Sequence, residues 1–407
     1  MNYKILALII IAVSCAYRLA LSVVRRKSFA NPVPENVSDV YDSETYAKWR
    51  RYSAEKASLE VYSILASSFL TFVLILTNAF GWVSGMLGNG VYAAALAVTL
   101  FSALTEALIG IPFQYVDDMI IEQKYGFNRT TKQTFVSDRI KETVISLILA
   151  CGLTCLLTLV HSWLGSRMII VFAAILFALI LLISFVFPFL TKIFNKFTDL
   201  EEGELKEKLT AMLEGHGYHV RAIQVMDASK RSSKTNAYFA GFGKTKTIVL
   251  YDTLVKAMTP DEICAVFAHE MGHGLHRDTL KNQLSSLISV FLIACAAYAA
   301  VSLPEIYPSF GFEGVNYGFA MILTGIALDI VNPLFSILTN ARSRRAEYRA
   351  DAQAAAEGYA GQLVSALKKL ARANFSHLSP APVIVMLEYS HPTLSQRISA
   401  IERCGKR

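Results

Sequence analysis

The sequence predicts an all-α membrane protein with seven transmembrane helices and a polar region on one side of the membrane. Hydrophobic residues make up 54% of the 407 residues and charged residues only 17%, whereas a soluble domain of this length would carry more charge. The hydrophobic residues form uninterrupted blocks, which indicate a bilayer. Loops with and without basic residues alternate along the chain, as is typical of a multi-pass protein.

Seven hydrophobic blocks have about the length that a helix needs to cross a bilayer. These blocks cover residues 3–24, 60–82, 88–114, 143–164, 168–190, 284–303 and 316–339. The first block lacks a convincing cleavage site and runs into Arg25, Arg26 and Lys27, so we interpret it as an anchor and not a signal peptide. The chain then divides into residues 1–190 with five spans, a polar segment 191–283, residues 284–339 with two spans, and a polar tail 340–407.

The charges in the loops predict the orientation. Lysine and arginine gather in residues 25–59 and 115–142, whereas residues 83–87 and 304–315 contain none. Because basic loops stay in the cytoplasm, the amino terminus is expected outside and the carboxy terminus inside. The polar segment and the tail then share the cytoplasmic side. These loops also account for the formal net charge of +7, so no nucleic acid partner is expected.

Residues 269–273 form the pattern His-Glu-x-x-His, which zinc peptidases use to hold a metal ion and activate water. A helix is expected here, because Thr259 can cap it and Pro260 suits its first turn. On a helix, His269 and His273 project from one face within reach of one ion. Glu270, between them, is the candidate general base.

Catalytic zinc usually takes three protein ligands and leaves a position for water. The extended pattern with a third histidine is absent, so a carboxylate is expected as the third ligand. Asp278 is too close in sequence to turn back easily, and Asp329 lies within a span. The predicted topology places Glu305 and Glu313 across the membrane from the histidines. The tail therefore holds the best candidates.

Residues 340–356 of the tail are predicted to form a helix with Glu347 and Asp351 on one face. Glu347 suits the third ligand position. Asp351 suits a supporting role, because a ligating histidine normally donates its other ring N–H to a carboxylate. The alternative is that both acids pair at helical spacing with Arg344, Arg345 or Arg349.

Three motifs occur in order across this seven-span chain: HEMGH (269–273), SRRAEYRADAQA (343–354) and HPTLSQRI (391–398). Together they resemble the type I CAAX prenyl endopeptidases, which are membrane-integrated zinc metalloproteases. Two further stretches, at 122–131 and 194–254, also look like that family. The resemblance implies that seven helices enclose a hydrated chamber with one zinc ion at its cytoplasmic end.

The resemblance also implies roles for single residues. The matches to the zinc site are His269, His273 and Glu347 as ligands, Glu270 as general base and acid, and Asp351 as the carboxylate behind a ligand. His391 and Arg397 match residues associated with substrate or oxyanion binding, although His391 by itself would be taken for a surface residue. Asn236 and Ala237 begin the strand that would pair with the substrate backbone.

Residues 236–252 also predict a small β-hairpin, because apolar and β-branched residues alternate on both sides of Gly243 and Lys244. The edge of such a strand can bind an extended peptide through main-chain hydrogen bonds.

Four polar residues lie in or near the hydrophobic blocks: Arg18, Glu106, His161 and Asp329. Their exposure to lipid would be costly, so they are expected to face an interior such as a chamber. Polar pairing between helices without a chamber is the alternative.

The chain is shorter than typical eukaryotic members of the family, which favours a bacterial or archaeal plasma membrane over the endoplasmic reticulum. Prokaryotes generally lack protein prenylation, so the expected partners are a peptide or protein, with prenylation of its C-terminus left open, and membrane lipid. Two alternative functions are a heat-shock membrane metalloprotease, whose members have fewer spans, and a channel or transporter with a structural zinc site.

Overall fold

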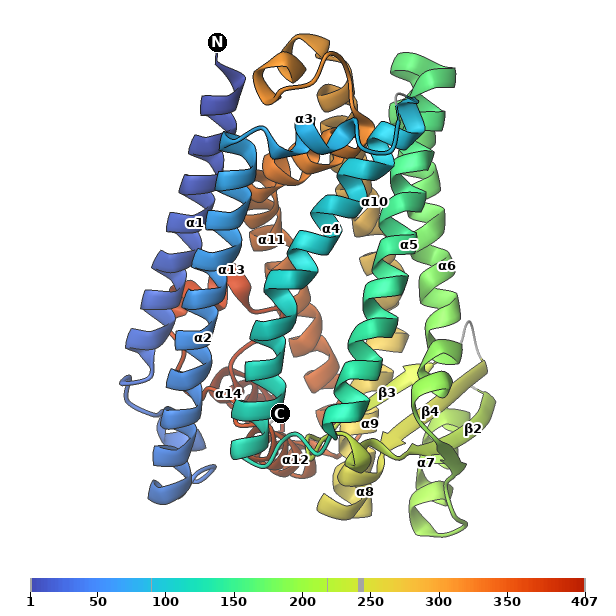
Figure 1. The fold of residues 1–407 in the computed structure, drawn as a ribbon. Coiled ribbons are helices and arrows are strands. Elements are labelled where there is room, and N and C mark those ends of the chain that lie inside the picture. The colour runs from blue at the N-terminus through green and yellow to red at the C-terminus, as the bar shows by residue number, and fades with distance from the viewer. Residues whose placement is uncertain (1, 89, 218, 241–244, 406–407) are drawn as a thin grey trace.

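The computed structural model describes residues 2–88, 90–217, 219–240 and 245–405, and it consists mostly of long helices that stand side by side (Figure 1). The long helices are α1 (Tyr3–Ser28), α2 (Ser43–Leu76), α4 (Val91–Tyr115), α5 (Lys132–Leu164), α6 (Met168–Phe194), α10 (Asp278–Val301) and α11 (Tyr317–Ala356). Among the described residues, six segments are long and apolar enough to cross a membrane, and one of them, Lys132–Val186, covers α5 and most of α6. The turn η3 (Gly165–Arg167) separates these two helices. The predicted all-α membrane fold is confirmed.

Several helices extend beyond the apolar blocks that predicted them. Helix α2 begins at Ser43, where Asp42 caps it through a hydrogen bond from the backbone of Thr45. Helix α11 continues without a break from the membrane block to Ala356, so the expected boundary between span and tail at 339/340 lies inside one helix. Hydropathy marks the part of a helix that faces lipid, whereas caps and packing determine where the helix ends.

The loops rich in lysine and arginine and the loops poor in them lie at opposite ends of the helices, whose arrangement Figure 1 shows. The amino terminus, α3 (Ala79–Ser84), η3 and η5 (Pro304–Phe310) occupy one end. The opposite end holds the basic loop between α1 and α2 with η1 (Glu35–Val37), the end of α4 with the π-helical turn η2 (Val116–Glu122), and the polar regions. Loops rich and poor in basic residues, which alternate along the chain, thus lie at the two opposite ends of the helix bundle.

The polar segment between α6 and α10 combines helices with a four-stranded sheet. Its helices are α7 (Glu204–Gly215), η4 (Ala228–Lys230), α8 (Asp252–Ala257) and α9 (Pro260–Leu275), and its strands are β1 (Phe197–Asp199), β2 (His219–Met226), β3 (Ala237–Ala240) and β4 (Thr245–Tyr251). The strand order is β1-β2-β4-β3, with β2 and β4 parallel and the other pairs antiparallel. The predicted hairpin is present as β3 and β4, with Ala237 opposite Leu250, but its expected turn at Gly243 and Lys244 lies outside the described residues.

Three short helices follow α11 in the tail: α12 (Ala360–Ala373), α13 (Pro382–Glu388) and α14 (Leu394–Gly405). Helices α12 and α14 lie beside α9 and α11 at the end of the bundle that holds the sheet (Figure 1). One buried apolar cluster joins α9 to α7, β2, β4 and α12. The sheet and the tail therefore form one packed region around the middle of α9.

Polar cavities lie between the membrane helices, as the predicted chamber requires. One cavity of about 490 Å³ is lined by Arg18 and Asp329, and it shares Arg18, Arg25 and Glu60 with a neighbouring cavity of about 470 Å³. His161 behaves differently, because its Nδ1 lies 2.9 Å from the hydroxyl of Tyr317 on α11. Interior cavities thus account for Arg18 and Asp329, and pairing between helices accounts for His161. Glu106, also expected to face an interior, is exposed on α4 and lines neither cavity.

A close contact between α9 and α11 brings the histidine helix against the helix that carries Glu347. Gly272 lies at this contact, and a Cβ atom placed there would be 2.9 Å from the Cα of Ala350 and 3.2 Å from the Cβ of Gln353. Only a glycine allows the two backbones to approach this closely without moving apart.

Gly272→Ala should therefore destabilise the protein by about 1–3 kcal/mol, the usual cost of adding atoms to a tightly packed contact. The melting temperature of the purified protein and its metal content should both fall, because the histidines move away from Glu347.

Gly325→Ala is the matched control, since Gly325 lies inside α11 and a Cβ atom added there would meet nothing within 4 Å. This variant should be as stable as the wild type. Equal melting temperatures for Gly272→Ala and Gly325→Ala would show that the close contact does not set the position of α9.

Candidate active site

Helix α9 begins at the cap that the sequence predicts, Thr259, which with Glu262 forms a complete capping box. The hydroxyl of Thr259 accepts a hydrogen bond from the backbone of Glu262, and the carboxylate of Glu262 accepts one from the backbone of Thr259 at 2.8 Å. Glu262 also bonds Ser365 and Lys369 on α12, both at 2.6 Å. The start of the histidine helix is thereby fixed to the tail.

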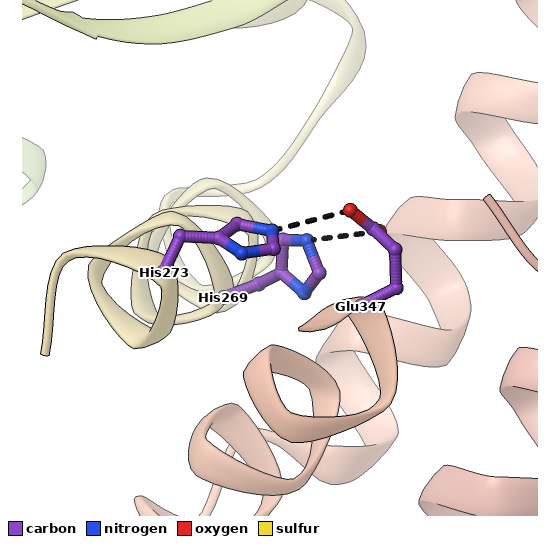
Figure 2. A group of neighbouring side chains, drawn as sticks. All are labelled: His269, His273 and Glu347. Carbon is purple, nitrogen blue, oxygen red and sulfur yellow. Dashed lines mark ion pairs between the residues drawn. The ribbon is translucent and has the colours of Figure 1, made fainter. Parts of the chain in front are cut away.

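His269 and His273 project from α9 toward Glu347 on α11 (Figure 2). The Nε2 atom of His273 lies 3.2 Å from Oε1 of Glu347, and that of His269 lies 3.5 Å from Oε2. One ligand atom from each residue lies within 4.8 Å of the other two, so the three atoms can surround one ion. The third ligand expected from the sequence is therefore in position.

The surroundings of Glu347 fit a cation between these three residues. Its Oε2 atom is buried and accepts no hydrogen bond from the described residues, although Nε2 of His269 and Nη1 of Arg397 lie within 3.5 Å. A buried acceptor without a donor is costly. Two imidazoles and one carboxylate also form a donor set typical of catalytic zinc.

The carboxylates around the two histidines raise the pKa of both imidazoles. Burial alone would lower the pKa of His273, but its hydrogen bonds to Glu347 and Asp278 raise that pKa to about 9. Burial would also lower the pKa of His269, but its hydrogen bond to Asp351 and its contact with the carboxylate of Glu347 raise that pKa. The carboxylates thus favour positive charge between the two helices.

Each histidine has a buried carboxylate behind it. Nδ1 of His269 lies 2.8 Å from Oδ1 of Asp351, as predicted, and Nδ1 of His273 lies 3.1 Å from Oδ2 of Asp278. Asp351 is 1% exposed and Asp278 4% exposed. Such carboxylates fix the ring orientation and tautomer of a ligating histidine.

Asp278 is the residue that the sequence reasoning missed. Arg277 between α9 and α10 has a left-handed backbone, with φ of 54°. This sharp turn places Asp278 at the start of α10, where its carboxylate faces back toward His273 and also accepts a 2.8 Å hydrogen bond from Arg349. A positive φ is uncommon for arginine, and no motif in the sequence signals it.

Arg397 on α14 is held by the same group of carboxylates. Its Nε and Nη2 atoms donate to the two oxygens of Asp351 at 2.9 and 2.6 Å, and Nη1 lies 3.4 Å from Glu347. This bidentate pair orients Asp351 against His269. The alternative pairing of Glu347 and Asp351 with arginines on their own helix is absent among the described contacts: Arg349 bonds Asp278, and Arg344 bonds main-chain carbonyls.

His391 lies on the loop between α13 and α14, with its Nε2 atom 3.4 Å from Oε1 of Glu347 and its side chain 62% exposed. Arg344 on α11 holds this loop by donating to the carbonyl oxygens of Val385 and Tyr389, at 2.9 and 2.6 Å. His391 is thus close to the carboxylate and still accessible from the cavity.

One cavity of about 300 Å³ brings the predicted residues together. It is lined by His269, Glu270, His273, Glu347, His391 and Arg397, together with Asn236 and Ala237 at the start of β3. Of the residues singled out from the sequence for the site, only Asp351 lies outside this lining, directly behind His269. The cavity can therefore hold a peptide bond beside a metal ion, a carboxylate and an exposed histidine.

Comparison with known families covers almost the whole chain. Residues 23–196 match the CAAX prenyl protease N-terminal region with five membrane helices, and residues 199–404 match Peptidase family M48. The family implies a metal cofactor and a peptide or protein substrate.

Individual proteins give the same result. CAAX prenyl protease 1 of Saccharomyces cerevisiae is 31% identical over 91% of this chain and 88% of its own, and a homolog from Arabidopsis thaliana is 33% identical over 91% and 90%. The crystal structure of S. mikatae Ste24p superposes with a TM-score of 0.92 at 27% identity and covers 99% of both chains. The chain is therefore a multi-pass membrane metalloprotease that belongs to peptidase family M48, in its CAAX prenyl protease 1 group.

Proposed function

We propose that this protein is a zinc endopeptidase that cleaves peptides near the C-terminus, with its active site on the cytoplasmic side. The observation that carries the proposal is the convergence of His269, His273 and Glu347, whose Oε2 atom accepts no hydrogen bond from the described residues, in a cavity that is also lined by Glu270. The names of the relatives favour prenylated CAAX proteins as the substrates. The source membrane, expected to be bacterial or archaeal, stays a prediction.

The match to the five-helix N-terminal region favours this function over that of the heat-shock membrane metalloproteases, which have fewer spans. An accessible carboxylate between the two histidines also favours catalysis over a structural zinc site, because a structural site is usually closed by four ligands.

The chemistry follows from the positions of the side chains. Zinc, when bound by His269, His273 and Glu347, supplies a Lewis acid that polarises the scissile carbonyl and acidifies water. Glu270 accepts the proton of the attacking water and passes it to the leaving amine. His391 donates a hydrogen bond to the developing oxyanion, a contribution often worth about 3 kcal/mol.

The remaining residues position these groups. Asp351 and Asp278 orient the two histidines, and Arg397 fixes Asp351 and restrains Glu347. The observed contacts of Arg397 favour this positioning role over direct substrate binding. Asn236 directly precedes the edge strand β3 and Ala237 begins it, and an extended peptide can pair with this strand through its backbone.

The first prediction concerns metal retention. Glu347→Gln keeps the size of the side chain but removes the anionic ligand, so the purified protein should lose zinc. Asp278→Asn and Asp351→Asn should each weaken zinc affinity about ten- to a hundredfold, the usual effect of losing a carboxylate behind a ligand. Metal analysis after dialysis against graded chelator measures both effects.

Glu357→Gln is the control, because Glu357 lies on the same tail but bonds Gln353 and His216 outside the cavity. Equal zinc content in Glu347→Gln and Glu357→Gln would refute the assignment of the third ligand.

The second prediction separates metal binding from chemistry. Glu270→Gln should retain zinc and bind peptide, while turnover falls about a hundred- to ten-thousandfold, the usual worth of general acid–base catalysis. The assay uses a farnesylated CAAX peptide and its unprenylated twin, with and without a zinc chelator. Wild-type turnover in Glu270→Gln, in a preparation free of other proteases, would exclude the hydrolytic mechanism.

The third prediction tests the side of the membrane. Lys230 in η4 of the polar segment and Glu313 just after η5 are both exposed. The polar segment and η5 lie at opposite ends of the bundle (Figure 1). With Cys404→Ser as background, a thiol reagent that cannot cross membranes should label Glu313→Cys in intact cells. Lys230→Cys should react only after the membrane is opened. Labelling of both positions from outside would contradict the proposed topology.

A further inference from the structure

A buried carboxylate at the end of α4 connects the membrane helices to residues 231–236, which precede strand β3 and are called the β3 lead-in. Glu122 is the last residue of the π-helical turn η2 and is 7% exposed. Its Oε1 atom accepts hydrogen bonds from Tyr52 at 2.5 Å and from Lys56 at 3.0 Å, both on α2. Its Oε2 atom lies 3.0 Å from Nζ of Lys234, two residues before Asn236.

The backbone reinforces this connection. The carbonyl oxygen of Glu122 accepts hydrogen bonds from Phe127 and Asn128, at 2.8 and 3.2 Å. Residues 127–129 then pair with residues 231–233 in an antiparallel manner, through Arg129 to Arg231 at 3.0 Å and Ser233 to Phe127 at 3.1 Å. Glu122 thus contacts both segments of this antiparallel pair. Its main chain bonds the segment 127–129, and its side chain contacts Lys234, which directly follows the segment 231–233.

The π-helical turn provides the geometry for the charge cluster. Lys56 contacts both Asp117, at 2.6 Å, and Glu122. Residues five apart in an α-helix point about 140° away from each other, whereas the wider turn with its i to i+5 bond brings them to one face. Such turns are rare and occur frequently at functional sites.

A displacement of this antiparallel pair would affect the site through strand β3. It is the last strand in the sheet order, so among the described residues its outer edge has no strand partner. Its first residue, Ala237, and the preceding Asn236 line the cavity that His269 and Glu270 also line. Thr235, just before them, bonds Asn374 at 3.2 Å, and Lys234 bonds Glu122.

We propose that Glu122 is a positioning residue for the substrate, because its ion pair with Lys234 sets the place of the β3 edge relative to the metal site. The inference rests on the proposed function, in which the peptide backbone pairs with that edge. Binding of the peptide backbone depends on Glu122, whereas metal binding and proton transfer depend on α9 and α11.

The test compares Glu122→Gln, Lys234→Gln and the double variant of the full-length protein, using the CAAX peptide that the wild type cleaves. Each single variant should raise KM about tenfold, a change within the range of interaction free energies measured for charged residues in contact. The kcat should stay within about twofold of the wild-type value, and the zinc content should not change. The double variant should have the same KM as the single variants. Equal losses in kcat, a loss of zinc, or additive effects in the double variant would overturn the proposal.

A second readout distinguishes positioning from general loosening. Peptides carrying one N-methyl group at each backbone amide in turn should bind the wild type more weakly at the amide that pairs with β3. Glu122→Gln should lose this preference for the unmethylated peptide. Retention of the full preference would show that the β3 edge has not moved and would overturn the proposal.

Glu55→Gln is the matched control. Like Glu122, Glu55 accepts hydrogen bonds from a lysine and a tyrosine: from Lys124 at 2.6 Å and from Tyr125 at 3.0 Å. It has no described contact with the β3 lead-in. Its KM should equal that of the wild type, and an increase as large as that of Glu122→Gln would contradict the role of Lys234. The wild type is assayed first. If it cleaves no peptide, the proposed function fails and this inference fails with it, whereas a cleaving wild type with unchanged variants contradicts the inference alone.

Discussion

The close packing of α9 on α11 is the contact on which the rest of the site depends. Two histidines on one helix cannot complete a catalytic zinc site, because the third ligand must come from another element. Gly272 lies between the two histidines and allows the backbone of α9 to approach Ala350, which lies between Glu347 and Asp351 on α11. One glycine thus places both carboxylates within reach of the histidine rings.

The continuity of α11 explains how a hydrolytic site can lie at the end of a membrane bundle. The helix starts after the side-chain cap of Asn316, passes Asp329 at a polar cavity, and ends beyond Glu347 and Asp351. The proposed metal ligand Glu347 and the membrane segment therefore lie on one continuous helix. Polar side chains such as Arg18 and Asp329 line cavities between the membrane helices, so polar surroundings extend into the bundle that carries the site.

Much of the fold and most of the candidate site could be predicted from the sequence, because their signals are local or periodic. The hydrophobic blocks, the cap at Thr259 and the i, i+4 histidine pair each depend on a short stretch of chain. Topology and distance left the tail as the source of the third ligand, and Glu347 could be chosen there because it shares a predicted helix face with Asp351. Strand β2 could not be predicted, because its neighbour β4 is parallel and distant in sequence. The role of Asp278 could not be predicted either, because the left-handed backbone of Arg277 has no signature in the sequence.

The distribution of charge around the histidines explains why so many acidic groups can be buried together. Three carboxylates, those of Glu347, Asp351 and Asp278, contact the two imidazoles. Two arginines, Arg397 and Arg349, contact these carboxylates from the other side.

The two arginines do not balance the negative charge of the three carboxylates. The uncompensated negative charge favours either protonated imidazoles or a divalent cation between them. The raised pKa values of His269 and His273 reflect the first state. A metal ion can bind only to neutral imidazoles, so it must displace these protons. The carboxylates that orient the histidines for the metal therefore also hold the protons that compete with it.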